Sequence, residues 1–312
     1  MRRWGPIGLV LLVAALGAHP AAAAGPTAYA YDTTAVGIDR PFTIGIAGDG
    51  TVWVGGSGAY LHNFPSRILR FDPFTGNALS GWPKTTEATA SVPGINDLLV
   101  DGNDVWVADQ TKSTITRARV LQNDIAPGYP KATGGTAPQG LAIGPDGDLW
   151  VANLNSNNVS RFDHSSGAQI GGYPKPTGNP STDQIVGAND VTIGDDGDAW
   201  VSIWDPGAGK GEVTRLDGVT GDVVTGYPET LNSTTKTVAI ATGLDGDIWV
   251  ASESSDLSRL DPETGAQRLG YPKYTEQMQT GDMAIGPDGD VWITDQALSK
   301  VIRVDGDTGA TV

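Results

Sequence analysis

The amino-acid sequence predicts an all-β protein, a six-bladed β-propeller with four antiparallel strands in each blade. Three observations lead to this prediction. One tryptophan-centred motif recurs six times, the copies lie 43 to 53 residues apart, and glycine and proline make up about a fifth of the chain. Periods of roughly 40 to 50 residues built from short strands are typical of propeller blades. Frequent helix breakers exclude long helices.

Residues 1–24 form a predicted leader. Two arginines follow Met1, an apolar run covers residues 7–16, and three alanines precede Gly25. This order is typical of a secretory signal peptide. The alternative is a membrane anchor, but about ten apolar residues are too few for a span, which needs roughly 20. We therefore expect a secreted or periplasmic protein whose propeller covers residues 25–312.

The charge balance excludes several classes of partner. The chain has 36 acidic and 20 basic residues, a formal net charge of −16, and loss of the leader makes it −18. Such a field repels nucleic acid and anionic membranes. The absence of cysteine excludes disulfides, thiolate metal sites and cysteine nucleophiles. We expect a monomer with no nucleic-acid partner and no membrane span.

Each copy of the tryptophan motif is interpreted as two strands of a blade. In LAIGPDGDLWVAN, Leu141 to Ile143 form the innermost strand and Leu149 to Val151 the second. The Asp-Gly-Asp segment between them is predicted to be a tight turn. The six copies cover residues 44–56, 98–109, 141–153, 191–203, 240–252 and 283–295.

Two further segments complete each repeat. A segment such as NVSRFD is the predicted third strand, and Gly-Tyr-Pro-Lys or a close variant marks the outermost strand, because proline cannot donate to a sheet ladder. Arginines recur at one position of the third strand, which predicts a repeated inter-strand ion pair. They are Arg70, Arg161, Arg215, Arg259 and Arg303; the second repeat departs from the pattern with ITRARV.

One outer strand is missing from this count, because six tryptophan motifs accompany five Gly-Tyr-Pro segments or close variants of them. Residues 27–38 have the alternating character of a strand. We expect them to complete the sixth blade, so that the N- and C-terminal segments pair and close the ring. The alternative is that the chain is a piece of a longer array.

One face of the predicted propeller carries the segments that enter each innermost strand and leave each second strand. The candidate ligand-binding residues lie there: Asn96, Asp97, Gln139, Asn189, Asp190, Trp204, Glu253, Asp282 and Asp295. Four of these residues from alternate blades form a candidate Ca²⁺ or Mg²⁺ site, namely Asn96, Asn189, Asp190 and Asp282, because hard oxygen ligands suit these ions. Turn capping at strand entries explains the same residues without a metal.

The repeat GPDGDLWVA, then V-x-R-x-D, then Gly-Tyr-Pro resembles the blade of virginiamycin B lyase. It is also similar to NHL-type and gluconolactonase-like propellers. The resemblance runs over essentially all of residues 25–312, but its motifs specify a blade and not a chemistry.

The two resemblances imply different site residues. The lyase implies histidines and glutamates around Mg²⁺ with a histidine base. Beyond the leader this sequence has only His62 and His164, on opposite faces. The gluconolactonase-like propellers imply a divalent cation held by a glutamate, an asparagine and an aspartate. Asn96 and Asn189 stand at comparable positions, and Phe42 and Thr43 replace the glutamate.

Two functions are therefore compatible with the sequence. The first is a propeller that binds a small molecule or a partner protein at this face without a catalytic set. The second is a divalent-metal-dependent lyase or lactonase-like hydrolase that uses the same face. The second function predicts three or more carboxylates or amides that converge on one cation.

Overall fold

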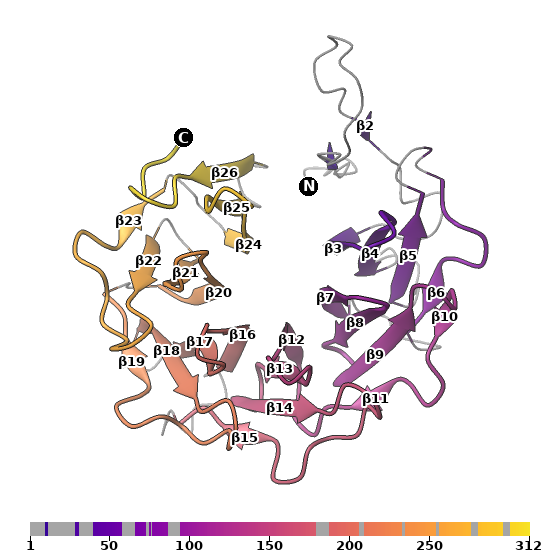
Figure 1. Cartoon of the computed structure of the whole chain (residues 1–312), viewed down its shortest axis with the longest axis horizontal. Helices are drawn as coiled ribbons and strands as arrows, with labels where there is room; N and C mark the ends of the chain where they lie inside the picture. Colours follow the sequence, from indigo (N-terminus) through magenta and orange to yellow (C-terminus); the bar gives the residue numbers. More distant parts are fainter. Residues whose placement is uncertain are drawn as a thin grey trace, which may run out of the picture. The chain divides into compact units, whose positions relative to one another are not determined.

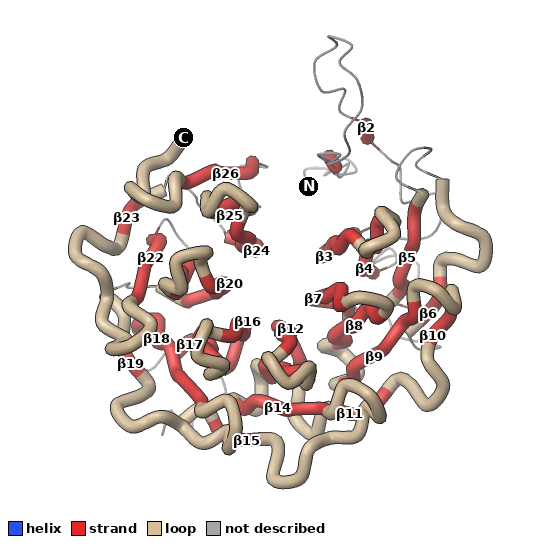
Figure 2. The backbone as a smooth tube through the Cα atoms, viewed as in Figure 1, coloured by secondary structure: helices blue, strands red, loops and turns tan. Residues whose placement is uncertain are grey.

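The computed structural model is built of antiparallel strands joined by turns (Figures 1 and 2). It describes residues 10–11, 29–30, 40–57, 66–72, 75, 77–86, 94–178, 187–205, 209–232, 235–253, 256–275, 280–295 and 300–312. No helix occurs among them, and therefore none that could cross a membrane. Their contacts divide the chain into two units: Met1–Val107 with Thr116–Pro130, and Ala108–Ile115 with Lys131–Val312.

The first unit contains the first blade and most of the second. Strands β1 (Val10–Leu11) and β2 (Tyr29–Ala30) pair with each other. The first blade consists of β3 (Arg40–Ile46), β4 (Val52–Ser57), β5 (Arg67–Phe71) and β6 (Lys84–Thr85). The second consists of β7 (Ile95–Asp101), β8 (Asp104–Asp109), β9 (Thr114–Arg119) and β10 (Asp124–Ile125), and β11 (Lys131–Ala132) pairs with the Thr114–Ile115 end of β9.

The second unit contains the other four blades. The third is β12 (Pro138–Ile143), β13 (Leu149–Asn153), β14 (Asn158–Phe162) and β15 (Lys175–Pro176). The fourth is β16 (Gly187–Ile193), β17 (Ala199–Asp205), β18 (Lys210–Leu216) and β19 (Glu229–Thr230). The fifth is β20 (Thr237–Thr242), β21 (Ile248–Ser252), β22 (Asp256–Leu260) and β23 (Lys273–Tyr274). The sixth is β24 (Thr280–Ile285), β25 (Val291–Asp295) and β26 (Lys300–Val304), with a bridge from Val304 to Thr311.

The six-bladed propeller class is confirmed, because each predicted repeat forms one antiparallel sheet in chain order. The predicted closing strand, residues 27–38, lies outside the described residues except for Tyr29–Ala30, which pair with Val10–Leu11. The leader also lies outside them apart from β1, so secretion stays a prediction.

A buried tryptophan forms the centre of each of the first five blades. Trp249, for example, is 1% exposed and meets the ring of Tyr271 edge-on, with ring centroids 5.6 Å apart. The guanidinium of Arg259 covers the indole, with Cζ 4.9 Å from the ring centroid. Aromatic edge contacts and cation–π contacts both favour this arrangement. The tyrosine of the Gly-Tyr-Pro segment is therefore part of the blade core.

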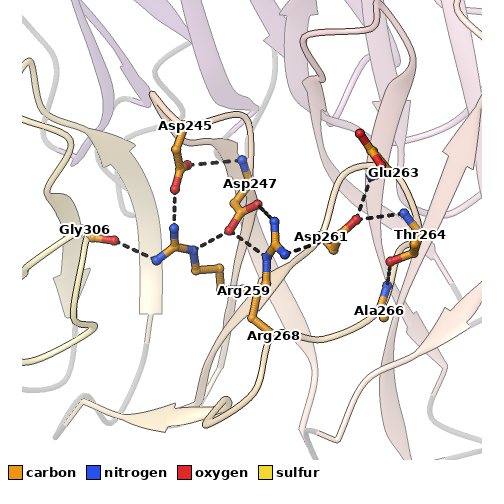
Figure 3. Close-up of polar contacts among 9 residues, drawn as sticks. All are labelled: Asp245, Asp247, Arg259, Asp261, Glu263, Thr264, Ala266, Arg268 and Gly306. Carbon is orange, nitrogen blue, oxygen red and sulfur yellow. Dashed lines mark hydrogen bonds and ion pairs between the residues drawn. The ribbon is translucent and has the colours of Figure 1, made fainter.

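The recurring arginine explains why the third to sixth blades share an Asp-Gly-Asp turn. Arg259 donates from Nε to Asp247 at 2.6 Å, from Nη2 to Asp245, and from Nη1 to the carbonyl of Gly306 in the next blade at 2.9 Å (Figure 3). Arg215 bonds its own turn and the carbonyl of Pro262 in the same way. The predicted inter-strand ion pair is confirmed, and it also joins neighbouring blades.

The second blade departs from the pattern less than its sequence indicates. Arg117 lies over Trp106 at 5.2 Å and bonds Asp104 through Nε and Nη2. The arginine of ITRARV is therefore retained. Arg119 replaces the aspartate of the other repeats and pairs with Asp124 instead.

Candidate functional site

A β-bulge interrupts the innermost strands at one recurring place. The register shifts between Pro41 and Thr43, Pro138 and Gly140, Ala188 and Asp190, Thr237 and Ala239, and Thr280 and Met283. A bulge increases the local twist and redirects the side chains around it. The residues that the sequence singles out before each innermost strand, such as Gln139 and Asn189, lie at these bulges. We call this end of the blades the bulge end.

An aspartate stands at the bulge in the fourth and sixth blades and at the equivalent position of the repeat in the second blade. Its Oδ1 accepts the backbone N–H of the following residue at 2.7 to 2.8 Å in each case. The pairs are Asp97 with Leu98, Asp190 with Val191, and Asp282 with Met283. This is the local capping that the sequence offered as the alternative to metal binding. Capping uses only one of the two carboxylate oxygens, so it leaves room for a further role.

Asp190 and Asp282 of the second unit interact electrostatically, since the charge of Asp282 affects the pKa of Asp190, and we call them the acidic pair. Burial and, to a smaller extent, the charge of Asp282 raise the pKa of Asp190 to about 7, against the opposing effect of the N–H groups of Ile240 and Val191. The Ile240 N–H reaches Asp190 Oδ2 from the fifth blade at 3.0 Å. The pKa of Asp282 is also raised, because the surrounding protein removes part of its hydration although the residue itself is exposed. The pair therefore carries less than two negative charges at neutral pH.

The carboxylate of Asp190 packs against a glycine of the third blade. A Cβ atom on Gly140 would lie 2.3 Å from Asp190 Oδ1 and 2.6 Å from Asp190 Cα. Real Cβ atoms do not approach other atoms this closely, and the backbone of Asp190 is held by the bulge. Gly140 is therefore required for the observed position of the acid.

Replacing Gly140 by alanine should lower the free energy of unfolding by about 1–3 kcal/mol, the usual effect of overpacking. Gly171→Ala is the matched control, because a Cβ there meets nothing within 4 Å. Urea unfolding of both variants measures the difference. Equal stability of the two variants would contradict the close packing of Asp190 on the third blade.

The other predicted residues also lie at the bulge end. Trp204 pairs with Gly187 in the fourth blade, and Asp295 pairs with Thr280 in the sixth. Both Trp204 and Asp295 therefore lie near the end of the second strand of their blade, beside a bulge. The backbone N–H of exposed Glu253 bonds the carbonyl of Lys236 just before β20. These three predicted residues thus lie next to bulges of the second unit; whether they bind a ligand stays a prediction. Asn96 and Asp97 belong to the first unit and lie in β7.

The predicted metal ligands do not by themselves form a complete coordination shell in the described residues. Asn189 is buried, and its Nδ2 donates to the carbonyl of Thr237 at 2.7 Å. No group of three or more histidine, aspartate or glutamate side chains suited to a metal occurs in the described part of the chain. Ca²⁺ takes about six to eight oxygen ligands. Asp190 and Asp282 would therefore need amide, backbone or water oxygens to complete the shell.

The two histidines beyond the leader form no catalytic set in the described residues. His62 lies outside them. His164 lies beside the Asp-Gly-Asp turn of the third blade, where its Cβ is 3.9 Å from the position of a Cβ on Gly147. That turn is at the opposite end of the blade from the bulges.

Sequence reasoning missed two hydroxyl groups that hold the bulges. Ser202 Oγ accepts the backbone N–H of Asp190 at 3.1 Å, and Thr294 Oγ1 accepts that of Asp282 at 2.8 Å. Both hydroxyls stand two residues after the blade tryptophan, where the other blades carry alanine or glycine. The serine and threonine at this position could therefore have indicated, from the sequence alone, that the fourth and sixth blades hold their bulges in the same way.

Comparisons with known proteins show the fold. The chain has a TM-score of 0.69 to a catalytically inactive virginiamycin B lyase from Staphylococcus aureus solved with quinupristin, at 17% identity over 88% of this chain and 83% of that one. A streptogramin B lyase gives 0.68 at 19% identity over 89% and 83%. A provisionally named 6-phosphogluconolactonase from Bacteroides uniformis gives 0.66 at 16% identity over 92% and 87%.

The resemblance inferred from the repeats is thus confirmed at the level of the fold. No protein-family model matches the sequence, and no curated protein matches it. Identities below 20% carry no residue roles from these structures to this chain.

Proposed function

We propose that this protein binds a small ligand that carries a cationic or hydrogen-bond-donating group, at the bulge end of its blades. The observation that carries the proposal is the acidic pair of Asp190 and Asp282, contributed by two different blades. A positive group placed there reduces the repulsion between the two carboxylates. A basic side chain of a partner protein has the same chemistry. Because a secretory leader is predicted, the proposed site of action is outside the cytoplasm.

A metal-dependent lyase or lactonase-like hydrolase is the second candidate function. The same acidic pair favours it, because Asp190 and Asp282 supply the hard oxygens that Ca²⁺ or Mg²⁺ prefers. A cation bound there would polarise a carbonyl or activate water. The chain itself would hold the ion through these two carboxylates and orient it through the backbone bonds of Asp190 to Val191 and Ile240.

Thermal unfolding with three probes tests both functions. We expect methylammonium chloride at millimolar concentration to raise the melting temperature of the wild type by about 2–4 °C, through mass action on the folded state. Asp190→Asn should remove most of this increase. Asp195→Asn is the matched control, because Asp195 is exposed in the turn at the opposite end of the blade. CaCl₂ and MgCl₂ are compared at the same ionic strength.

The probes separate the two functions. An increase with Ca²⁺ or Mg²⁺ alone, lost in Asp190→Asn, would favour the metal-dependent function over the simple binding protein. Turnover of a streptogramin or a lactone by the metal-loaded protein would then identify the reaction. If none of the three probes changes the melting temperature, both proposals are wrong.

A further inference from the structure

Lysines occupy one recurring position at the joints between blades of the second unit. They begin the short outer strands and are Lys131, Lys175 and Lys273. Lys175 Nζ forms an ion pair at 2.7 Å with Asp222 Oδ1 of the next blade. Lys131 Nζ donates to the carbonyl of Ser166 in the next blade at 3.1 Å. Within the described residues, Lys273 has no such acceptor.

The difference lies in the residue that faces the lysine. Ala310 of the sixth blade is equivalent to Asp222 of the fourth, because the N–H of Asp305 bonds the Ala310 carbonyl as the N–H of Asp217 bonds that of Asp222, both at 2.9 Å. Ala310 is exposed. The joint at Lys175 therefore has a carboxylate, that of Asp222, whereas the joint at Lys273 has an alanine at the equivalent position.

Lys273 nevertheless reaches the sixth blade. Its Cε lies 3.2 Å from the position of a Cβ on Gly309, and its Nζ lies 5.5 Å from the ring centroid of Tyr271. The lysine stem is thus packed between the two blades. Its ammonium group is held at the joint, where the equivalent Lys175 meets its acid.

The arginines at this joint already bind acceptors through all three of their guanidinium nitrogens. Arg268 donates from Nε and Nη2 to Asp247 at 3.0 and 2.5 Å, and from Nη1 to Asp261 at 2.7 Å (Figure 3). Arg259 is bonded to the same turn and to the Gly306 carbonyl. Among the described residues of this joint, Lys273 is therefore a cation that has no carboxylate or carbonyl partner.

A cavity of about 480 Å³ opens at this joint. Lys273 and Arg268 line it together with Leu269, Tyr271 and Asp307. Leu269 is fully exposed, so the cavity has an apolar side. Its charged lining consists of three basic residues, Arg259 among them, and three aspartates, two of which are bonded to the arginines. The Asp-Gly-Asp turn of the fifth blade also lines it, which places it at the opposite end of the blade from the acidic pair.

We propose that this cavity is a second binding site, which takes a small monocarboxylate. The ligand oxygens occupy the place on Lys273 that Asp222 occupies on Lys175. Leu269 and the Tyr271 ring contact the aliphatic part of the ligand. Asp307 is exposed and forms no ion pair in the described residues, and its negative charge disfavours a second carboxylate on the same ligand.

Amide chemical shifts of the full chain, titrated with sodium propionate, test this site. Sodium chloride at equal ionic strength is the reference, and succinate is the dicarboxylate probe. We expect saturable shifts at Gly309 and Ala310 with a millimolar dissociation constant, and weaker binding of succinate. Lys273→Gln should weaken propionate binding about threefold to fivefold, the effect of losing one exposed ion pair.

Two further variants keep the test independent of folding defects. Ala310→Asp supplies an internal carboxylate to Lys273, so it should block propionate while the melting temperature stays at or above that of the wild type. Asp222→Ala opens the joint at Lys175 and should create new saturable shifts around Gly221. Propionate shifts that sodium chloride reproduces, or that neither Lys273→Gln nor Ala310→Asp weakens, would overturn the proposal.

Discussion

Replacing Trp249 by alanine should lower the free energy of unfolding by about 4 kcal/mol, within the range for a fully buried aromatic side chain. The indole is 1% exposed, Arg259 covers it, and the edge of Tyr271 packs on it. Its removal leaves a cavity and also deprives both neighbours of their aromatic contact. Urea denaturation with tryptophan-independent detection, such as circular dichroism, measures the loss.

Trp292→Ala in the sixth blade is the matched control. Arg303 lies over this indole at 5.4 Å, but Trp292 is only partly buried and no aromatic ring meets it in the described residues. The sixth repeat lacks a Gly-Tyr-Pro segment, so the aromatic partner is missing. We expect Trp292→Ala to cost about half as much as Trp249→Ala. Equal losses would show that burial and the tyrosine contact do not stabilise the fifth blade.

The blade architecture was predictable because the residues within each repeat are enough to indicate its strands and turns. Alternating apolar residues, a glycine turn and a β-branched strand around Trp150 are local signals, and six copies reinforce one another. The partners of Arg259 were not predictable in this way. The sequence places Asp261 two residues later, whereas strand pairing of Trp249 with Arg259 brings the guanidinium to the turn at Asp245 and Asp247.

The candidate site was predictable as a set of positions and not as a set of contacts. Aligning the repeats was enough to find Asn189, Asp190 and Asp282 at one end of the blades. Their contacts depend on the bulges and on packing between blades. The bond from Asp190 to the N–H of Ile240 spans 50 residues, and the space at Gly140 belongs to a third blade. No local pattern encodes such separations.

Asp190 should make the protein less stable as the pH rises from about 4 to about 7. Its pKa is about 7 in the folded state, against an ordinary value of 3.8. Between these values the folded state binds more protons than the unfolded state, so the stabilising contribution is complete below pH 4 and is lost as the pH passes 7. A shift of this size corresponds to at most about 4 kcal/mol.

The comparison of wild type with Asp190→Asn isolates this contribution. The free energy of unfolding is measured between pH 4.5 and 8 in a chelator-containing buffer, so that no divalent ion competes with the proton. The wild-type value minus the variant value should fall steadily as the pH rises, because asparagine does not titrate. Asp195→Asn is measured in parallel as the control for loss of one aspartate at the opposite end of the blade. A pH-independent difference for Asp190→Asn would show that the carboxyl is ionised throughout, and that Asp282 and burial do not hold a proton on it.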